Sequence, residues 1–139
     1  MALSSEPMDS EIEEALVRAF IVPHELRRYA SRLALPKARQ KFMNSHLFHM
    51  RDLDPRYATR IAPVDQHASK IFEMLRARGA PERCYVISGS SDRDGTEAEL
   101  RKALDETVGN YDGTFLSCVH GKLAYFEGEE PNERYILAR

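Results

Sequence analysis

The hydrophobic pattern of this chain changes its predominant period close to Gly79. Before that glycine, apolar residues recur at the three- and four-residue spacing of amphipathic helices. After it, they form short runs rich in β-branched and aromatic residues, beginning with residues 84–88, and such runs are typical of buried strands. The sequence therefore predicts an α+β fold, in which a helical part (residues 11–80) precedes a sheet-forming part (residues 83–139).

Prolines and a glycine divide the helical part into about four predicted helices. Pro23 ends the first helix and can open the second, and Pro36 opens the third, because proline fits the first position of a helix. Gly79 is the expected C-terminal cap of the fourth helix. The segment before this last helix, residues 51–63, contains two prolines and is predicted to be a loop with one short turn.

The sheet-forming part matches a βαβββ arrangement. A helix is predicted after the first strand, because Thr96 and Glu99 have the spacing of a capping box and Gly109 follows as a stop signal. Since a strand–helix–strand connection joins parallel strands, we expect a small mixed sheet whose first two strands are parallel. One helix cannot cover both faces of this sheet, so the N-terminal helices are expected to pack on it. The predicted strands are residues 84–88, 114–119, 123–127 and 135–138.

Length and composition indicate one domain. The 139 residues fall within the usual size of a single domain. We place this domain at residues 11–139, after residues 1–10, which have the polar composition of a flexible terminus. No apolar run approaches the roughly 18 residues of a membrane helix, and residues 1–9 lack the features of a signal peptide. We therefore expect a cytoplasmic protein with no membrane partner.

The two cysteines, Cys84 and Cys118, are too few for a disulfide scaffold or for a zinc site made of thiolates alone. On parallel strands they would be offset by about four residues, or roughly 13 Å. This separation is too large for a disulfide. We expect both to be ordinary thiols.

The predicted parallel strands bring polar side chains to one edge of the sheet, where α/β sheets bind ligands. The candidate ligand-binding residues are Ser90, Ser91, Asp92, Asp94 and Lys122. The loop that follows the first strand lacks the lysine of a P-loop and the three glycines of a dinucleotide fingerprint, so we predict no cofactor. Its other interpretation is a Gly/Ser/Asp turn, and that of Lys122 is a hairpin lysine that discourages edge pairing.

Charge is distributed unevenly along the chain, whose net charge is −2. Residues 15–83 carry fourteen basic and six acidic residues, whereas residues 84–139 carry six basic and eleven acidic residues. A basic surface in the helical part is suited to nucleic-acid phosphates or an acidic protein. The alternative is a solvated face neutralised by the acidic C-terminal part. The candidates for this surface are Arg27, Arg28, Arg32, Lys37, Arg39 and Lys41.

Two further groups of residues have a possible chemistry and a simpler explanation. Cys118 and His120 alternate along a strand and are spaced for a nucleophile–base pair, but they also suit a core cysteine and a turn histidine. His46 and His49 are suited to a metal site together with Asp52, Asp54 and His67. Because histidines are also favoured at the end of a helix, we predict no metal site.

Several segments resemble a group of small bacterial proteins that have no assigned function. The resemblance covers residues 53–58, 83–88, 113–128 and 134–137. It implies a bacterial source and no particular activity. Position 120 is usually proline in that group, so the resemblance does not favour His120 as a general base, whereas Gly121 and Lys122 match the pattern.

Together these observations predict a binding or regulatory module that has an unknown protein or small-molecule ligand at the strand ends. One alternative is an enzyme that acts on a phosphorylated or acyl substrate at the same edge, with or without magnesium. Another is a nucleic-acid-binding protein that uses the basic residues between positions 27 and 60.

Overall fold

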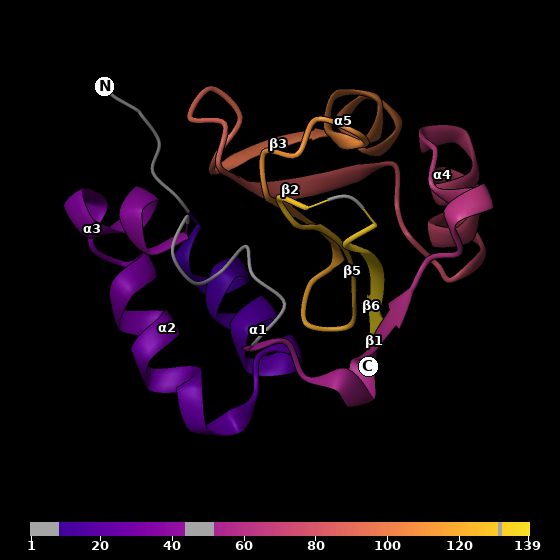
Figure 1. Ribbon diagram of the computed structural model, residues 1–139. Coiled ribbons are helices and arrows are strands. Elements are labelled where there is room, and N and C mark those ends of the chain that lie inside the picture. The colour runs from indigo at the N-terminus through magenta and orange to yellow at the C-terminus, as the bar shows by residue number, and fades with distance from the viewer. Residues whose placement is uncertain (1–8, 44–51, 131) are drawn as a thin grey trace.

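A single sheet of six strands organises the part of the chain that this computed structural model describes, residues 9–43, 52–130 and 132–139 (Figure 1). The strand order is β1-β6-β5-β4-β2-β3, and every neighbouring pair is antiparallel. The strands are β1 (Ala58–Arg60), β2 (Arg83–Ser88), β3 (Thr96–Glu99), β4 (Thr114–Val119), β5 (Leu123–Glu127) and β6 (Arg134–Ala138).

Five α-helices and three short 3-10 helices accompany the sheet in the described residues. The α-helices are α1 (Ser10–Phe20), α2 (Leu26–Leu33), α3 (Pro36–Phe42), α4 (Ala68–Ala77) and α5 (Leu100–Thr107). The 3-10 helices η1 (Pro23–Glu25), η4 (Pro55–Tyr57) and η5 (Pro63–Asp65) all begin with a proline. Because proline has a helical φ and no N–H to satisfy, it starts each of these turns without loss of a hydrogen bond.

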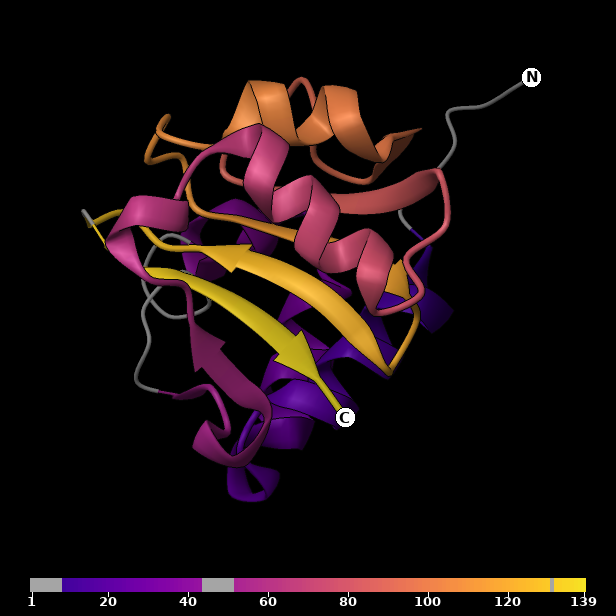
Figure 2. The ribbon, with the colours of Figure 1, turned by 90° about the vertical axis from the view of Figure 1, so that its right-hand side faces the viewer.

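The helices cover both faces of the sheet, which gives a single-domain α+β fold with three layers. On one face, α1 to α3 contribute Leu16, Phe20 and Tyr29 to a core that includes Phe115 and Phe126 of the sheet. The core on the other face is formed by α4 and α5 together with alternate residues of the same strands. Figure 2 shows α4 in front of the sheet and α5 above it at the top of the view, with α1 to α3 behind the sheet. The predicted packing of N-terminal helices on the sheet is confirmed.

The predicted parallel pair of strands is wrong, because β2 and β4 are antiparallel. Their register pairs Ser88 with Thr114 and Tyr85 with Ser117, so the end of β2 meets the start of β4. The extra strand β3 causes this reversal. It pairs with β2 as an antiparallel hairpin before α5 returns the chain to the start of β4, so the connection contains three changes of direction and is not a simple crossover.

Two elements differ from the predicted ones in the type of structure. The helix predicted from Thr96 begins only at Leu100, and residues 96–99 form β3, whose backbone pairs with β2. The predicted loop at residues 51–63 contains β1, which pairs with β6. The remaining strand predictions agree with β2, β4, β5 and β6 to within one residue.

The boundaries of the helical part also have a structural explanation. Asp9 and Ser10, which we expected to be flexible, begin α1, because the Asp9 carboxylate accepts hydrogen bonds from the N–H groups of Glu11 and Ile12. Residues 1–8 and the end of the predicted third helix, from residue 44, lie outside the described residues. None of the described helices has the length and apolar character needed to cross a membrane.

Candidate functional site

The residues of the predicted strand-end site do not come together. Ser90 to Asp94 lie between β2 and β3, next to the end of β2 that meets the start of β4. Lys122 follows the far end of β4, in the turn to β5. The whole length of β4 therefore separates Lys122 from the serine and aspartate residues, and the expected shared edge does not exist.

Asp94 belongs instead to a buried network of charged side chains. Its carboxylate accepts hydrogen bonds from Arg39 Nε at 2.8 Å and Nη2 at 3.0 Å, and from the Ser88 backbone N–H at 3.0 Å. Arg39 also donates to both oxygens of Glu13, at 2.6 and 2.7 Å. The Tyr85 hydroxyl donates to Glu13 at 2.7 Å, and burial raises the pKa of Tyr85. These bonds join α1, α3, β2 and the β2–β3 loop.

The other polar residues of the β2–β3 loop have a turn-like environment. Ser91 and Asp92 are exposed, and the Ser90 N–H donates to Ser88 Oγ at 3.0 Å. The same hydroxyl of Ser88 contacts Thr114 Oγ1 at 3.0 Å. This loop therefore fits the Gly/Ser/Asp turn that was the alternative interpretation of the sequence.

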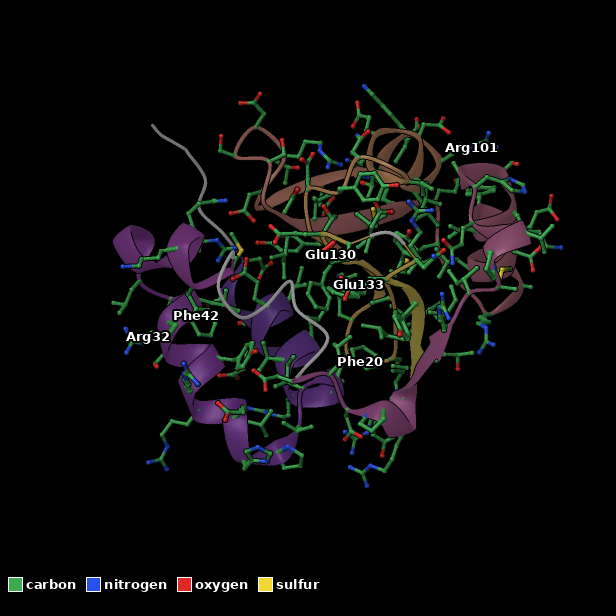
Figure 3. The ribbon with its side chains drawn as sticks, in the orientation of Figure 1. Phe20, Arg32, Phe42, Arg101, Glu130 and Glu133 are labelled. Atoms are coloured by element: carbon green, nitrogen blue, oxygen red, sulfur yellow. The ribbon has the colours of Figure 1, made fainter. Side chains whose placement is uncertain are left out.

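One residue of the predicted basic surface is buried in the interior of the protein. Arg39 is buried in the network described above, whereas Arg27, Arg28, Arg32 and Lys41 are exposed. Figure 3 shows Arg32 pointing away from the sheet, on the outer side of α2. The side chain of Lys37 lies outside the described part of the structure.

The other candidate groups are not assembled for chemistry. Of the proposed metal ligands, His46 and His49 lie outside the described residues, Asp52 accepts a hydrogen bond from Tyr29, and Asp54 is bonded to Arg56. No group of three or more His, Cys, Asp or Glu side chains in the described ranges is arranged to hold a metal ion. Cys118 is buried in the core, and His120 Nδ1 contacts Ser117 Oγ at 2.7 Å.

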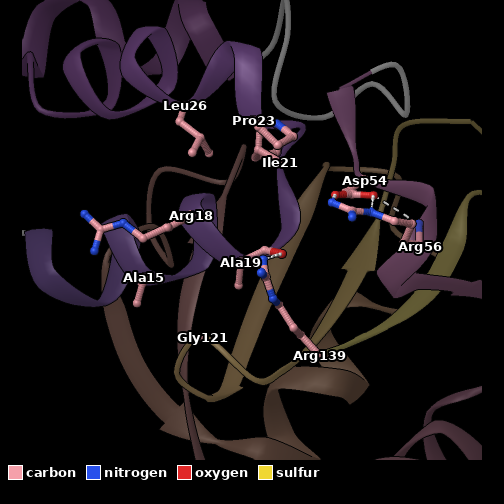
Figure 4. Close-up of a pocket in the computed structure, with 10 residues that line it drawn as sticks. All are labelled: Ala15, Arg18, Ala19, Ile21, Pro23, Leu26, Asp54, Arg56, Gly121 and Arg139. Atoms are coloured by element: carbon pink, nitrogen blue, oxygen red, sulfur yellow. Dashed lines mark hydrogen bonds and ion pairs between the residues drawn. The ribbon is translucent and has the colours of Figure 1, made fainter.

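A pocket of about 500 Å³ lies between α1, η4 and the β4–β5 turn (Figure 4). We call it the arginine pocket. Its apolar wall consists of Ala15, Ala19, Ile21, Pro23 and Leu26, and its polar wall consists of Arg18, Asp54, Arg56 and Arg139, with Gly121 completing the lining. Its volume and its combination of an apolar wall with a few charged groups are typical of small-molecule sites.

Each wall of the arginine pocket follows from the local sequence. Ala15, Arg18 and Ala19 recur at helical spacing and share one face of α1. The β4–β5 turn approaches this face closely: a Cβ atom on Gly121, whose φ is +77°, would lie 3.7 Å from Ala15 Cβ. Glycine therefore permits the turn conformation, and the turn lies at van der Waals distance from α1.

Two arginines share one aromatic ring beside the pocket. The guanidinium carbon of Arg139 lies 4.6 Å from the centre of the Tyr57 ring, and that of Arg56 lies 5.1 Å from it. Arg139 Nη1 also donates to the backbone oxygen of Ala19 at 3.2 Å. The Tyr57 ring thus makes cation–π contacts with both side chains, and the Ala19 carbonyl also holds Arg139.

Asp54 balances one of these two charges. Arg56 donates to the Asp54 carboxylate from Nε at 3.1 Å and from Nη2 at 2.7 Å. Hydrogen bonds from the Arg56 side chain hold the pKa of Asp54 below its usual range, and the charge of Arg139 acts in the same direction. Asp54 is therefore ionised at neutral pH, and its bonds leave the N–H groups of Arg56 Nη1 for other acceptors.

The side chains of the pocket retain positive charge after their ion pairs are counted. Arg18 forms an exposed ion pair with Glu14 at 3.0 Å, and Arg56 pairs with Asp54. Among the described residues, no carboxylate forms an ion pair with Arg139, whose guanidinium group has five N–H donors in total. In Figure 4 Arg139 lies between Arg18 and the Asp54–Arg56 pair. The arrangement is suited to an anion.

No local sequence pattern indicates this site, because its residues come from five separate segments of the chain. Two signals lay close to it: Arg56 and Gly121 both belong to the segments that carry the family resemblance, and Lys122 is the neighbour of Gly121. Comparison of the chain with protein-family models, with curated proteins and with solved structures found no match. The resemblance to a group of small bacterial proteins therefore stays a prediction.

Proposed function

We propose that this protein is a binding module for a small organic anion, which it takes up in the arginine pocket. The oxyanion of the ligand contacts the guanidinium groups of Arg139 and Arg56, and its apolar body lies against α1 and Leu26. A cytoplasmic location is part of this proposal.

The observation that carries the proposal is the pair of guanidinium groups on the Tyr57 ring. Both groups contact the ring, and Asp54 forms an ion pair with one of them, Arg56. A bound oxyanion would accept charge-assisted hydrogen bonds from these groups, and such bonds are about twice as strong as neutral ones. The positive charge that remains on the pocket side chains therefore favours an anionic ligand.

The apolar wall of the pocket favours a ligand whose uncharged part is apolar. Ala15, Ala19, Ile21, Pro23 and Leu26 offer no hydrogen-bonding side chain, so a ligand gains there only by burying apolar surface. A volume of about 500 Å³ admits a short acyl chain or a single aromatic ring attached to the oxyanion. We therefore expect both parts of the ligand to contribute to affinity.

A thermal-shift and calorimetry panel separates these contributions. Benzoate, hexanoate and phenyl phosphate contain both an oxyanion and an apolar body, benzyl alcohol and hexanol contain only the body, and acetate and inorganic phosphate contain only the oxyanion. We expect stabilisation by members of the first group and none by the other two groups at equal concentration, because only a ligand that prefers the native state raises its stability.

Substitution of the anchoring arginine provides the control for this panel. Arg139→Met is expected to weaken binding of the best oxyanion by about tenfold or more, the effect of a lost hydrogen bond between charged groups. Arg78→Met makes the same change of charge at the end of α4, away from the pocket, and should leave affinity unchanged. Equal affinities for all three proteins, or no binding by any member of the panel, would overturn the proposal.

Arg139→Met, together with substitutions of Arg27 and Arg32, also tests the alternative of nucleic-acid binding by the exposed arginines of α2. Nucleic-acid binding would weaken steeply with salt and on substitution of Arg27 and Arg32, and it would not respond to Arg139→Met. That pattern would replace the small-anion proposal with a phosphate-backbone interface on α2.

A further inference from the structure

The antiparallel register changes the relation between the two cysteines of the chain. Tyr85 of β2 pairs with Ser117 of β4, and the next residues along the two strands are Cys84 and Cys118. If this register continues by one residue, they face each other across neighbouring strands, at a point where the pairing of β4 with β5 has an irregularity between Ser117 and Val119. The predicted offset of about four residues assumed parallel strands, and it disappears when the strands are antiparallel.

The hydrogen-bonding pattern shows which kind of cross-strand pair they form. The Gly89 N–H donates to the Gly113 oxygen at 2.9 Å, one step beyond the pair of Ser88 and Thr114. The two kinds of pair alternate along an antiparallel ladder, so continuing the ladder one step beyond Tyr85 and Ser117 assigns Cys84 and Cys118 to a non-hydrogen-bonded position, as for Ser88 and Thr114. At such positions the Cα atoms are about 4.5 Å apart and the side chains approach closely.

Three further observations agree with this placement. The hydroxyls of Ser88 and Thr114, at the equivalent position, are 3.0 Å apart. Cys84 and Cys118 belong to the same apolar core, between the sheet and α4 and α5. Both also line one surface pocket of about 350 Å³, together with Tyr85, Glu97 and His120. A small molecule in this pocket would lie beside these two residues, each of which is 3% exposed.

We propose that Cys84 and Cys118 are a site of reversible modification, at which a low-molecular-weight disulfide oxidises them to a disulfide between β2 and β4. A cross-strand Cα separation of about 4.5 Å lies within the range that disulfides require. The sequence contains only two cysteines, so the reaction has a single intramolecular product. This proposal is independent of the arginine pocket.

The reaction proceeds in two exchange steps. The Cys84 thiolate attacks one sulfur of the small disulfide, which forms a mixed disulfide and releases one small thiolate. The Cys118 thiolate then attacks the Cys84 sulfur, which forms the protein disulfide and releases the second small thiolate. Two electrons pass from the cysteines to the small disulfide, and the two protons lost by the cysteines are taken up by the released thiolates.

The environment of the thiols sets the order and the pH dependence of these steps. Burial raises the pKa of Cys84 to about 12, and the positive charge of the neighbouring Arg83 opposes this rise. The pKa of Cys118 is raised mainly by burial and, to a smaller extent, by the nearby Cys84. Cys84, which has a cationic neighbour, is therefore the first nucleophile. Because the thiolate is the reactive form, the rate should rise about tenfold per pH unit between about pH 7 and 9.

The test uses hydroxyethyl disulfide with the reduced, folded protein, followed by intact-mass measurement after acid quenching. The wild type should lose two hydrogen atoms without accumulating an adduct. Cys118→Ser should stop at one mercaptoethanol adduct, located on Cys84. The oxidised wild type should also unfold at a higher urea concentration than the reduced protein, because the new bond restricts the unfolded chain. The variant that lacks both cysteines should show no such shift.

The contradicting outcomes are equally specific. Stable adducts on both cysteines of the wild type would show that the thiols cannot reach each other. A folded wild type that stays reduced, while the urea-unfolded chain reacts with the same reagent, would show that the pocket does not admit the disulfide. Either result would overturn the proposal.

Discussion

Arg39 joins three separate segments of the chain through one guanidinium group. It donates two hydrogen bonds to Glu13 of α1 and two to Asp94 of the β2–β3 loop, and all three side chains are buried. The two carboxylates would be costly in an apolar interior without this partner, because a buried charge loses its hydration. The network therefore fixes the position of α1, which forms one wall of the arginine pocket.

Removing Arg39 should destabilise the protein strongly. Arg39→Met leaves Glu13 and Asp94 buried without their cation, a type of change that costs about 3–5 kcal/mol. Arg101→Met, at an exposed arginine of α5, should change stability by less than about 0.5 kcal/mol. Urea denaturation of both variants measures the two effects. Equal effects would mean that the network contributes no more than a surface ion pair.

Asp54 should make stability depend on pH in the acidic range. Arg56 lowers the pKa of Asp54 in the folded protein, so the ionised form stabilises the fold above the unfolded-state pKa of about 3.9. This contribution is lost as the pH falls through the lower folded-state pKa. Asp54→Asn should therefore be less stable than the wild type at pH 7, with a difference that shrinks towards pH 3. A difference in urea midpoint that is independent of pH would contradict this role.

At the scale of elements, α1 depends on its first turn. The Asp9 carboxylate accepts hydrogen bonds from Glu11 N–H at 3.1 Å and Ile12 N–H at 3.2 Å. Asp9→Ala removes both bonds and should cost about 1 kcal/mol, whereas Asp9→Ser retains a capping oxygen and should cost less. Thermal unfolding of the two variants makes the comparison. Identical losses would show that the side chain does not act as a cap.

An element could be predicted correctly where a local sequence pattern determines its structure, and not where pairing with a distant strand determines it. Strands β2, β4, β5 and β6 lie within apolar runs buried on both faces, and these runs are visible in the sequence. Residues 96–99 have a capping-box pattern but form a strand, because pairing with β2 overrides a weak local preference. β1 has three residues next to prolines, too few to show a period.

The predicted strand-end site and the arginine pocket also differ in what determines them. The predicted strand-end site depended on a single topological inference, so the discovery of β3 removed it at once. The arginine pocket depends on contacts between α1, η4 and the β4–β5 turn. Such contacts leave no local pattern in the sequence, because arginines and alanines are common on exposed helices.

At the scale of the whole molecule, the strands link the two cores. Neighbouring residues of β5 alternate between them: Ala124 and Phe126 face α1 to α3, whereas Leu123 and Tyr125 face α4 and α5. A strand cannot lose one face without disturbing the other, because its residues share one backbone. We therefore expect both helical layers to unfold together.

Substitutions in the two cores test this cooperativity. Leu16→Ala in one core and Leu104→Ala in the other should each cost about 2–5 kcal/mol, since both side chains are fully buried. Both variants should shift one transition that circular dichroism and tyrosine fluorescence report identically. A separate early transition in Leu16→Ala would show that the α1–α3 layer unfolds by itself.

The most direct test of the central claim is amide chemical-shift mapping of the full chain during titration with benzoate. The proposed function predicts saturable shifts at Ala15, Ala19 and Gly121 that are absent from Arg139→Met and retained in Arg78→Met. It also predicts unchanged amides in β3, on the far edge of the sheet. Saturable shifts confined to the β2–β3 loop, or no saturable shifts at all, would contradict the assignment of the arginine pocket as the binding site.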